Sequence, residues 1–179
     1  TSAVQQLVDA GADALYIHGV TSEELLRRKQ LPALAERLAL LQATGLPSGV
    51  AAHDLEVIKT CESANIGCDF YVKTFHHLNY PTAPEPKDIK GPYAETPHGY
   101  WCACPEETAA FMRSVNKPWI AFKVMAAGAI PPRNAFQYAF QNGADFILAG
   151  MFDFEIAEDA QITRELIANI QNRQRPWRG

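Results

Sequence analysis

The sequence predicts an α/β protein and, within that class, the C-terminal part of a parallel (β/α)8 (TIM) barrel. Short apolar runs of strand length alternate with segments of helical periodicity along the chain. A Gly-x-Asp phrase precedes three of these runs, at residues 11–13, 67–69 and 143–145. No Gly-rich dinucleotide-binding turn follows a strand, which disfavours the competing doubly wound sheet.

Five strands are expected, beginning near residues 13, 48, 69, 119 and 145. Each repeated glycine suits the left-handed residue that follows a helix, and a strand comes directly after it. Because strands and helices alternate strictly, the strands should be parallel and joined by right-handed crossovers. One face of each strand carries small or polar residues, which is typical of a barrel interior rather than an open sheet with two apolar faces.

Capping residues mark where the helices begin. Thr21 to Glu24 has the pattern of a capping box, Asp54 precedes another helix, and Pro105 and Pro131 each open one. The predicted helices cover residues 3–10, 21–44 and 55–65, begin again at 105 and 131, and end with 158–171. Residues 172–179 are expected to form a polar tail.

A complete barrel averages about 250 residues and has eight strands. Residues 1–171 therefore correspond to five βα units, about strands four to eight. Missing N-terminal units or a partner chain should close the barrel, and a homo-oligomer is a further alternative. Residues 78–104 contain five prolines and little periodicity. A loop of this length that leaves the end of a strand is expected to be a lid on the catalytic face.

Composition excludes some partners. The 179 residues carry a net charge of −4, so no basic surface suggests nucleic acid, and no apolar run has the length of a membrane span. Four cysteines occur without a C-x-x-C pair: Cys61, Cys68, Cys102 and Cys104. They are expected to be reduced thiols in a cytoplasmic protein, with an exported bacterial protein that has lost its signal as the alternative.

Alternation along each strand predicts which side chains face the barrel interior. The interior set is Tyr16 and His18; Gly49, Ala51 and His53; Tyr71, Lys73, Phe75 and His77; Ala121, Lys123, Met125 and Ala127; and Ala149, Met151 and Asp153. Two lysines and three histidines share this parity. Such a lysine is costly unless it is paired, for example with a carboxylate on a missing strand, or catalytic.

Lys73 and Lys123, on adjacent strands, predict Schiff-base chemistry. Each ammonium disfavours the charge of the other, so one of the two pKa values should fall. A neutral lysine can attack a carbonyl substrate, while Tyr71, Tyr16 or a histidine such as His53 moves protons. No cofactor is needed for this reaction.

The segment Val72-Lys73-Thr74, together with Lys123 and the turn at residues 126–130, resembles the class I deoxyribose-phosphate aldolases. The resemblance implies that Lys73 forms the Schiff base and that Lys123 beside it lowers its pKa. The wider set of phosphate-binding barrels holds a phosphate after strands seven and eight. There the chain has Gly128 and Gly150, with Arg133 nearby, although two prolines and acidic residues oppose phosphate binding.

Two other functions remain open. His18, His53 and His77 (or His76) end successive strands and could hold a zinc, manganese or iron ion, as in a sugar epimerase, an isomerase or a hydrolase. The third alternative is a barrel that binds a small ligand without catalysis. His98, Cys102 and Cys104 lie in the expected lid and receive no role beyond closure over substrate.

Overall fold

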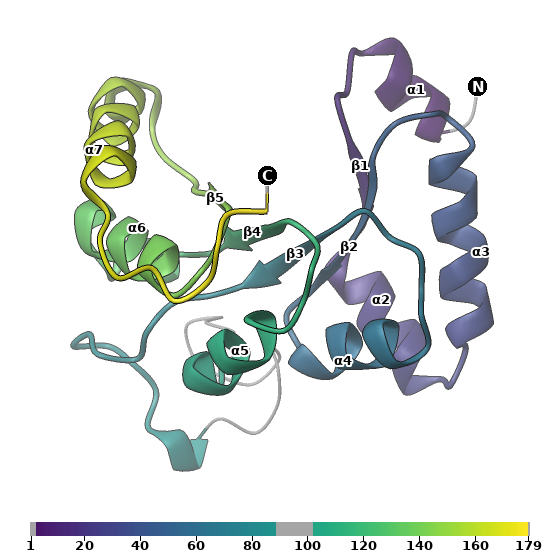
Figure 1. Ribbon diagram of the computed structural model, residues 1–179, viewed down its shortest axis with the longest axis horizontal. Helices are drawn as coiled ribbons and strands as arrows, with labels where there is room; N and C mark the ends of the chain where they lie inside the picture. Colours follow the sequence, from purple (N-terminus) through teal and green to yellow (C-terminus); the bar gives the residue numbers. More distant parts are fainter. Residues whose placement is uncertain (1–2, 89–101, 179) are drawn as a thin grey trace. The chain divides into compact units, whose positions relative to one another are not determined.

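The computed structural model describes residues 3–88 and 102–178 (Figure 1). It contains one sheet of five parallel strands whose spatial order is the order of the chain. The strands are β1 (Leu15–Ile17), β2 (Ser48–Ala52), β3 (Phe70–Thr74), β4 (Trp119–Phe122) and β5 (Phe146–Leu148). The expected mixed α/β class and all five strands are confirmed. The chain divides within β3 into two compact units, Thr1–Val72 and Lys73–Gly179.

The first unit has two strands, the start of β3 and four helices. The helices are α1 (Ala3–Asp9), α2 (Gly19–Arg27), α3 (Leu31–Gln42) and α4 (Leu55–Ser63). The single helix expected over residues 21–44 is wrong, because Lys29 is left-handed (φ 58°) and Pro32 starts a second helix. The Asp54 cap is confirmed, since its side chain accepts a hydrogen bond from the backbone N–H of Glu56 at 3.0 Å.

Within this unit, the side chains of β3 alternate opposite to the prediction. Tyr71, expected in a barrel interior, donates a hydrogen bond from its hydroxyl to Glu62 of α4 at 2.7 Å. Phe70, expected to face helices, instead lies against Gly49, where a Cβ would come within 2.4 Å of its ring. Gly49 pairs in register with Tyr16, so these three residues share the other face of the sheet. Because Gly49 has no side chain, it leaves the space that the Phe70 ring occupies in this register.

In its described part, the second unit holds the end of β3, β4, β5 and three helices: α5 (Pro105–Met112), α6 (Pro132–Gln141) and α7 (Ile156–Asn169). Short 3-10 segments lie at η1 (Pro86–Asp88), η2 (Ala126–Gly128) and η3 (Asp153–Glu155). Helices α6 and α7 lie side by side (Figure 1). Phe75 after β3 stacks on Tyr138 of α6, with ring centroids 5.1 Å apart, and meets Trp119 edge-on at 4.8 Å. Phe75 thus packs toward the helices, and its predicted interior position is wrong.

The expected polar tail is a docked segment. Arg175 is 1% exposed and donates hydrogen bonds to the carbonyls of Val115 and Lys117 at 3.0 and 2.6 Å. Arg173 and Arg175 both form ion pairs with the buried Asp145. Asp145 also accepts a hydrogen bond from the backbone N–H of Trp119 at the start of β4. The tail therefore closes the end of the sheet at which β4 and β5 begin.

Two other expectations bear on the fold. The four cysteines form no disulfide with one another. Among the helices of residues 3–88 and 102–178, none has the length and apolarity needed to cross a membrane. Most of the expected lid, including His98, lies outside the described residues.

Candidate functional site

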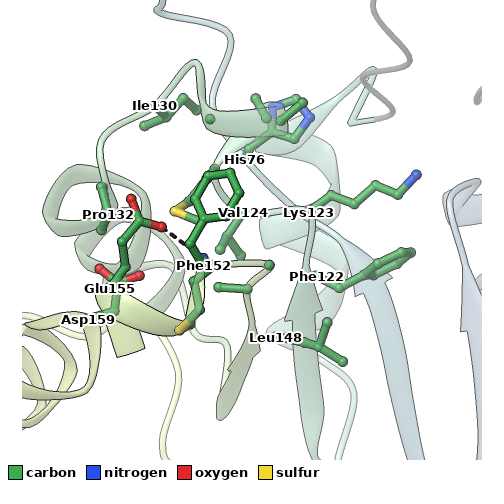
Figure 2. Close-up of a pocket in the computed structure, with 17 residues that line it drawn as sticks. His76, Phe122, Lys123, Val124, Ile130, Pro132, Leu148, Phe152, Glu155 and Asp159 are labelled. Atoms are coloured by element: carbon green, nitrogen blue, oxygen red, sulfur yellow. Dashed lines mark hydrogen bonds between the residues drawn. The ribbon is translucent and has the colours of Figure 1, made fainter. Parts of the chain in front are cut away.

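A cavity of about 740 Å³ lies in the second unit, where β4 and β5 end (Figure 2). Most of its wall is apolar side chain or small turn residue. Four of the lining residues have ionisable side chains: His76, Lys123, Glu155 and Asp159. The carboxyl ends of parallel strands are the usual ligand site of α/β proteins. Six other predicted site or interior positions line the same cavity as Lys123: Met125, Ala127, Gly128, Ala149, Gly150 and Met151.

Lys123 reaches the cavity from a turn rather than from a strand. β4 ends at Phe122, so the strand expected to continue to Ala127 is too long. Lys123, Ala126 and Ala127 have positive φ values of 57°, 46° and 58°. Non-glycine residues in this region cost about 1 kcal/mol or more each, and such strain is concentrated at functional sites. Lys123 Nζ lies 5.9 Å from the centroid of the Phe122 ring.

His76 is the cavity residue that sequence reasoning underrated, since it entered only as an alternative to His77. It is 1% exposed, and its Nδ1 donates to the carbonyl of His77 at 2.9 Å. This bond places the ring lone pair on Nε2. Burial lowers the pKa of His76 to about 4, and the positive charges of Lys73 and Lys123 act in the same direction. At neutral pH the ring is therefore an uncharged base.

Lys73 is not among the described residues that line the cavity. It is 1% exposed, and its Nζ donates to the carbonyl of Thr74 at 2.8 Å. Its position on β3 shares the parity of Phe75, which packs on α6. Burial raises the pKa of the Cys102 thiol, and the charge of Lys73 opposes that rise, so Lys73 interacts electrostatically with Cys102 as well as with His76.

Two carboxylates from the start of α7 and the turn before it form one side of the cavity. Glu155 accepts a hydrogen bond from the backbone N–H of Phe152 at 2.9 Å. Asp159 is 4% exposed, and burial together with the charges of Glu155 and Glu158 raises its pKa. Figure 2 shows both carboxylates on the side of Pro132, with Lys123 extending away from them on the opposite side.

The first unit contains a separate buried pair, His53 and Glu23. Glu23 Oε1 accepts hydrogen bonds from the backbone N–H groups of His53 and Asp54 at 2.5 and 2.8 Å. The His53 Nδ1 lies 3.2 Å from both carboxylate oxygens. Glu23, assigned to a capping box from sequence, instead orients His53 and holds the turn after β2. The two backbone N–H groups at the start of α4 have no partner within the helix, so they need such an acceptor. This requirement is the signal that sequence reasoning missed.

The remaining predicted residues are dispersed. Tyr16 is 44% exposed and His18 is exposed at the start of α2. His77 is held between the side chain of Asn134 at 3.0 Å and the backbone N–H of Asn79 at 3.1 Å. Arg133 forms an exposed ion pair with Glu165 at 2.7 Å.

No group of three or more His, Cys, Asp or Glu side chains within the described parts of the chain is arranged to hold a metal ion. Metal binding at His18, His53 and His77 stays a prediction.

Comparison with known proteins adds no constraint on this site. No protein-family model matches the chain, and neither a curated protein nor a solved structure is significantly similar to it.

Proposed function

We propose that this protein is an enzyme, a lyase of the aldolase type or an isomerase, that acts on a small carbonyl compound in the cavity after β4 and β5. The observation that carries the proposal is that Lys123 and His76 both line that cavity. An amine and an uncharged imidazole are the two groups that Schiff-base chemistry needs.

In this reaction the neutral Lys123 amine attacks the carbonyl carbon, and the carbonyl oxygen becomes a hydroxyl. His76 Nε2 carries the proton that the nitrogen loses to that oxygen, and a second proton, taken up from solvent, lets the hydroxyl leave as water. The protonated imine then withdraws electrons from the neighbouring carbon–carbon or carbon–hydrogen bond. Because His76 has a pKa of about 4, it accepts a proton only transiently and passes it on.

Lys73 keeps a role in the proposal. As the lysine that the aldolase resemblance makes the nucleophile, it is the second candidate for the covalent bond. Its burial and its bond to the Thr74 carbonyl support an electrostatic contribution instead, because its charge helps to keep His76 unprotonated. We assign the nucleophile to Lys123 and this electrostatic contribution to Lys73.

The barrel is part of the same proposal. Five parallel strands in chain order are what successive βα units of a (β/α)8 barrel produce. Phe146 and Leu148 of β5, on the parity opposite to the predicted interior residue Ala149, are 48% and 46% exposed. The barrel proposal therefore takes their face of β5 as the interior one, to be covered by further strands or a partner chain.

Borohydride trapping tests the reaction. The protein is incubated with short hydroxyaldehydes and sodium borohydride, and the adduct is located by peptide mass spectrometry. We expect the adduct on Lys123, its loss in Lys123→Arg, and no loss in Lys59→Arg, which alters a half-buried lysine of α4 that does not line the cavity. An adduct on Lys73 would assign the role of nucleophile to Lys73 instead. The absence of an adduct on both lysines would refute the Schiff-base mechanism. A stoichiometric metal ion lost with His53→Ala would then favour the metal-dependent alternative.

A further inference from the structure

We infer that the cavity is built for an uncharged hydroxyl-bearing substrate, that Asp159 binds its hydroxyl groups, and that substrates carrying phosphate are rejected. This inference rests on the proposed function in one respect, namely that the cavity is the substrate site. It departs from the phosphate-binding barrels that the sequence resembles.

Asp159 is the group that points to a ligand. It lines the cavity and is 4% exposed. Its backbone carbonyl accepts a bond from the Thr163 hydroxyl at 2.8 Å, but within the described residues its carboxylate accepts no hydrogen bond. A buried carboxylate without donors is costly. Hydroxyl groups of a substrate would supply the missing donors.

The charge of the wall opposes an anion. Glu155 and Asp159 are two carboxylates against the single ammonium of Lys123, and His76 is neutral near pH 7. The two carboxylates share one side of the cavity, so an anionic group placed there would meet both of them. A raised pKa of Asp159 agrees with this excess of negative charge.

Two of the usual phosphate donors are also missing at the start of α6. A phosphate site at a helix start depends on backbone N–H groups in the first turn. α6 begins after Pro131 with Pro132, and neither residue has an N–H. Arg133, next in the chain to the lining residue Pro132, is bound to Glu165 on α7 and is not among the described residues that line the cavity.

The positions of Lys123 and Asp159 on opposite sides of the cavity indicate the shape of the substrate. With its carbonyl at Lys123, a substrate would extend along the apolar wall, which includes Phe152 and Leu148, toward Asp159 (Figure 2). Its far end would carry one or more hydroxyl groups. This describes a short sugar or hydroxyketone without phosphate.

Unreactive polyols test the inference separately from the reaction. Xylitol and xylitol 5-phosphate contain no carbonyl, so their binding to the full chain cannot depend on a Schiff base. We expect saturation-transfer NMR to detect xylitol and to show at least about tenfold weaker binding of the phosphate. Asp159→Asn should weaken xylitol binding by about tenfold, as expected for losing one charged hydrogen-bond partner. Glu36→Gln, which removes an exposed charge on α3, is the matched control.

Tighter binding of xylitol 5-phosphate, competition by inorganic phosphate, or absence of xylitol binding would each overturn the inference. Circular dichroism and thermal unfolding establish that Asp159→Asn is folded, and an unfolded variant is replaced by Asp159→Ser. Xylitol binding without any borohydride adduct would refute only the proposed reaction. An adduct combined with a preference for phosphate would refute only this inference.

Discussion

His76 illustrates how burial, rather than residue type, sets the chemistry of a side chain. An exposed imidazole would be partly charged at neutral pH. Here the ring is 1% exposed, its Nδ1 is committed to the His77 carbonyl, and two lysines add positive charge nearby. This arrangement makes His76 a neutral base, because protonation of the ring is disfavoured in the folded state.

The low pKa makes stability depend on pH in one direction. In the unfolded chain His76 has its ordinary pKa of 6.5, and in the folded protein about 4. Between these values the unfolded state binds more protons, so the free energy of unfolding should be constant above pH 6.5 and fall as the pH drops toward 4. The His76 contribution is at most about 3 kcal/mol.

His76→Asn should therefore flatten this slope, and the exposed His18→Asn should not. The free energies of unfolding from urea titrations at several pH values provide the check. Parallel slopes for wild type and His76→Asn would show that His76 is not the titrating group.

The sequence identified Lys123 as a candidate site residue, and it lines the cavity, but the sequence did not show how the backbone presents it. The apolar run after Trp119 reads as one strand to Ala127, and alternation then assigns Lys123 to an interior face. The left-handed Lys123 ends the strand at Phe122 instead, and the left-handed Ala126 and Ala127 follow in the turn. Glycine in a sequence indicates such a turn, whereas alanine does not. The cost of a positive φ at alanine is offset by tertiary contacts, which no local pattern shows.

Glu23 links two elements by accepting N–H groups from the turn between β2 and α4. Glu23→Ala would leave those buried donors without this acceptor and remove the partner of His53. We expect it to lower the free energy of unfolding by about 2–3 kcal/mol. Glu23→Gln keeps an acceptor oxygen and should cost less.

Chemical denaturation checks both variants against Glu24→Gln. Glu24 is the adjacent residue, and it makes only exposed pairs with Arg27 and Arg28. Its loss should cost less than the loss of Glu23. Equal effects at the two positions would contradict the anchoring role of Glu23.

The tail is the element that sequence patterns described least well. Its composition is polar and without periodicity, which is typical of an unstructured end. Yet Asp145, from the third Gly-x-Asp phrase, binds both Arg173 and Arg175. The repeat could be seen in the sequence, but its partners thirty residues away could not, since a long-range ion pair leaves no local periodicity. The strands were predictable for the opposite reason: their signals are local.

Arg175→Leu should destabilise the second unit strongly. It removes hydrogen bonds to the carbonyls of Val115 and Lys117 and one of the two cations beside buried Asp145. Breaking a buried pair costs about 3–5 kcal/mol. Arg164→Leu on the exposed side of α7 is the control, with a change within about 0.5 kcal/mol. Thermal and urea unfolding measure both, and a tail that contributes nothing would give equal values.

At the scale of the whole molecule, the sheet has two ends in its described part, β1 and β5, since its order is β1-β2-β3-β4-β5. Parallel sheets are normally covered on both faces, and their strands normally have neighbours. Around β5, however, large apolar side chains are exposed, among them Phe146, Leu148 and Phe152. A barrel completed by additional strands or by a partner chain would bury this set.

Leu148→Glu distinguishes a completed barrel from an open sheet. If further strands or a second copy cover β5, the charge is placed in an apolar interior and the free energy of unfolding should fall by about 2 kcal/mol or more. Leu40→Glu on α3 is the control, because Leu40 is 67% exposed against 46% for Leu148. Urea unfolding and sedimentation are measured on the protein in its native assembly. Changes within about 0.5 kcal/mol for both variants, with unchanged sedimentation, would mean that the face near β5 meets solvent and that the barrel proposal is wrong.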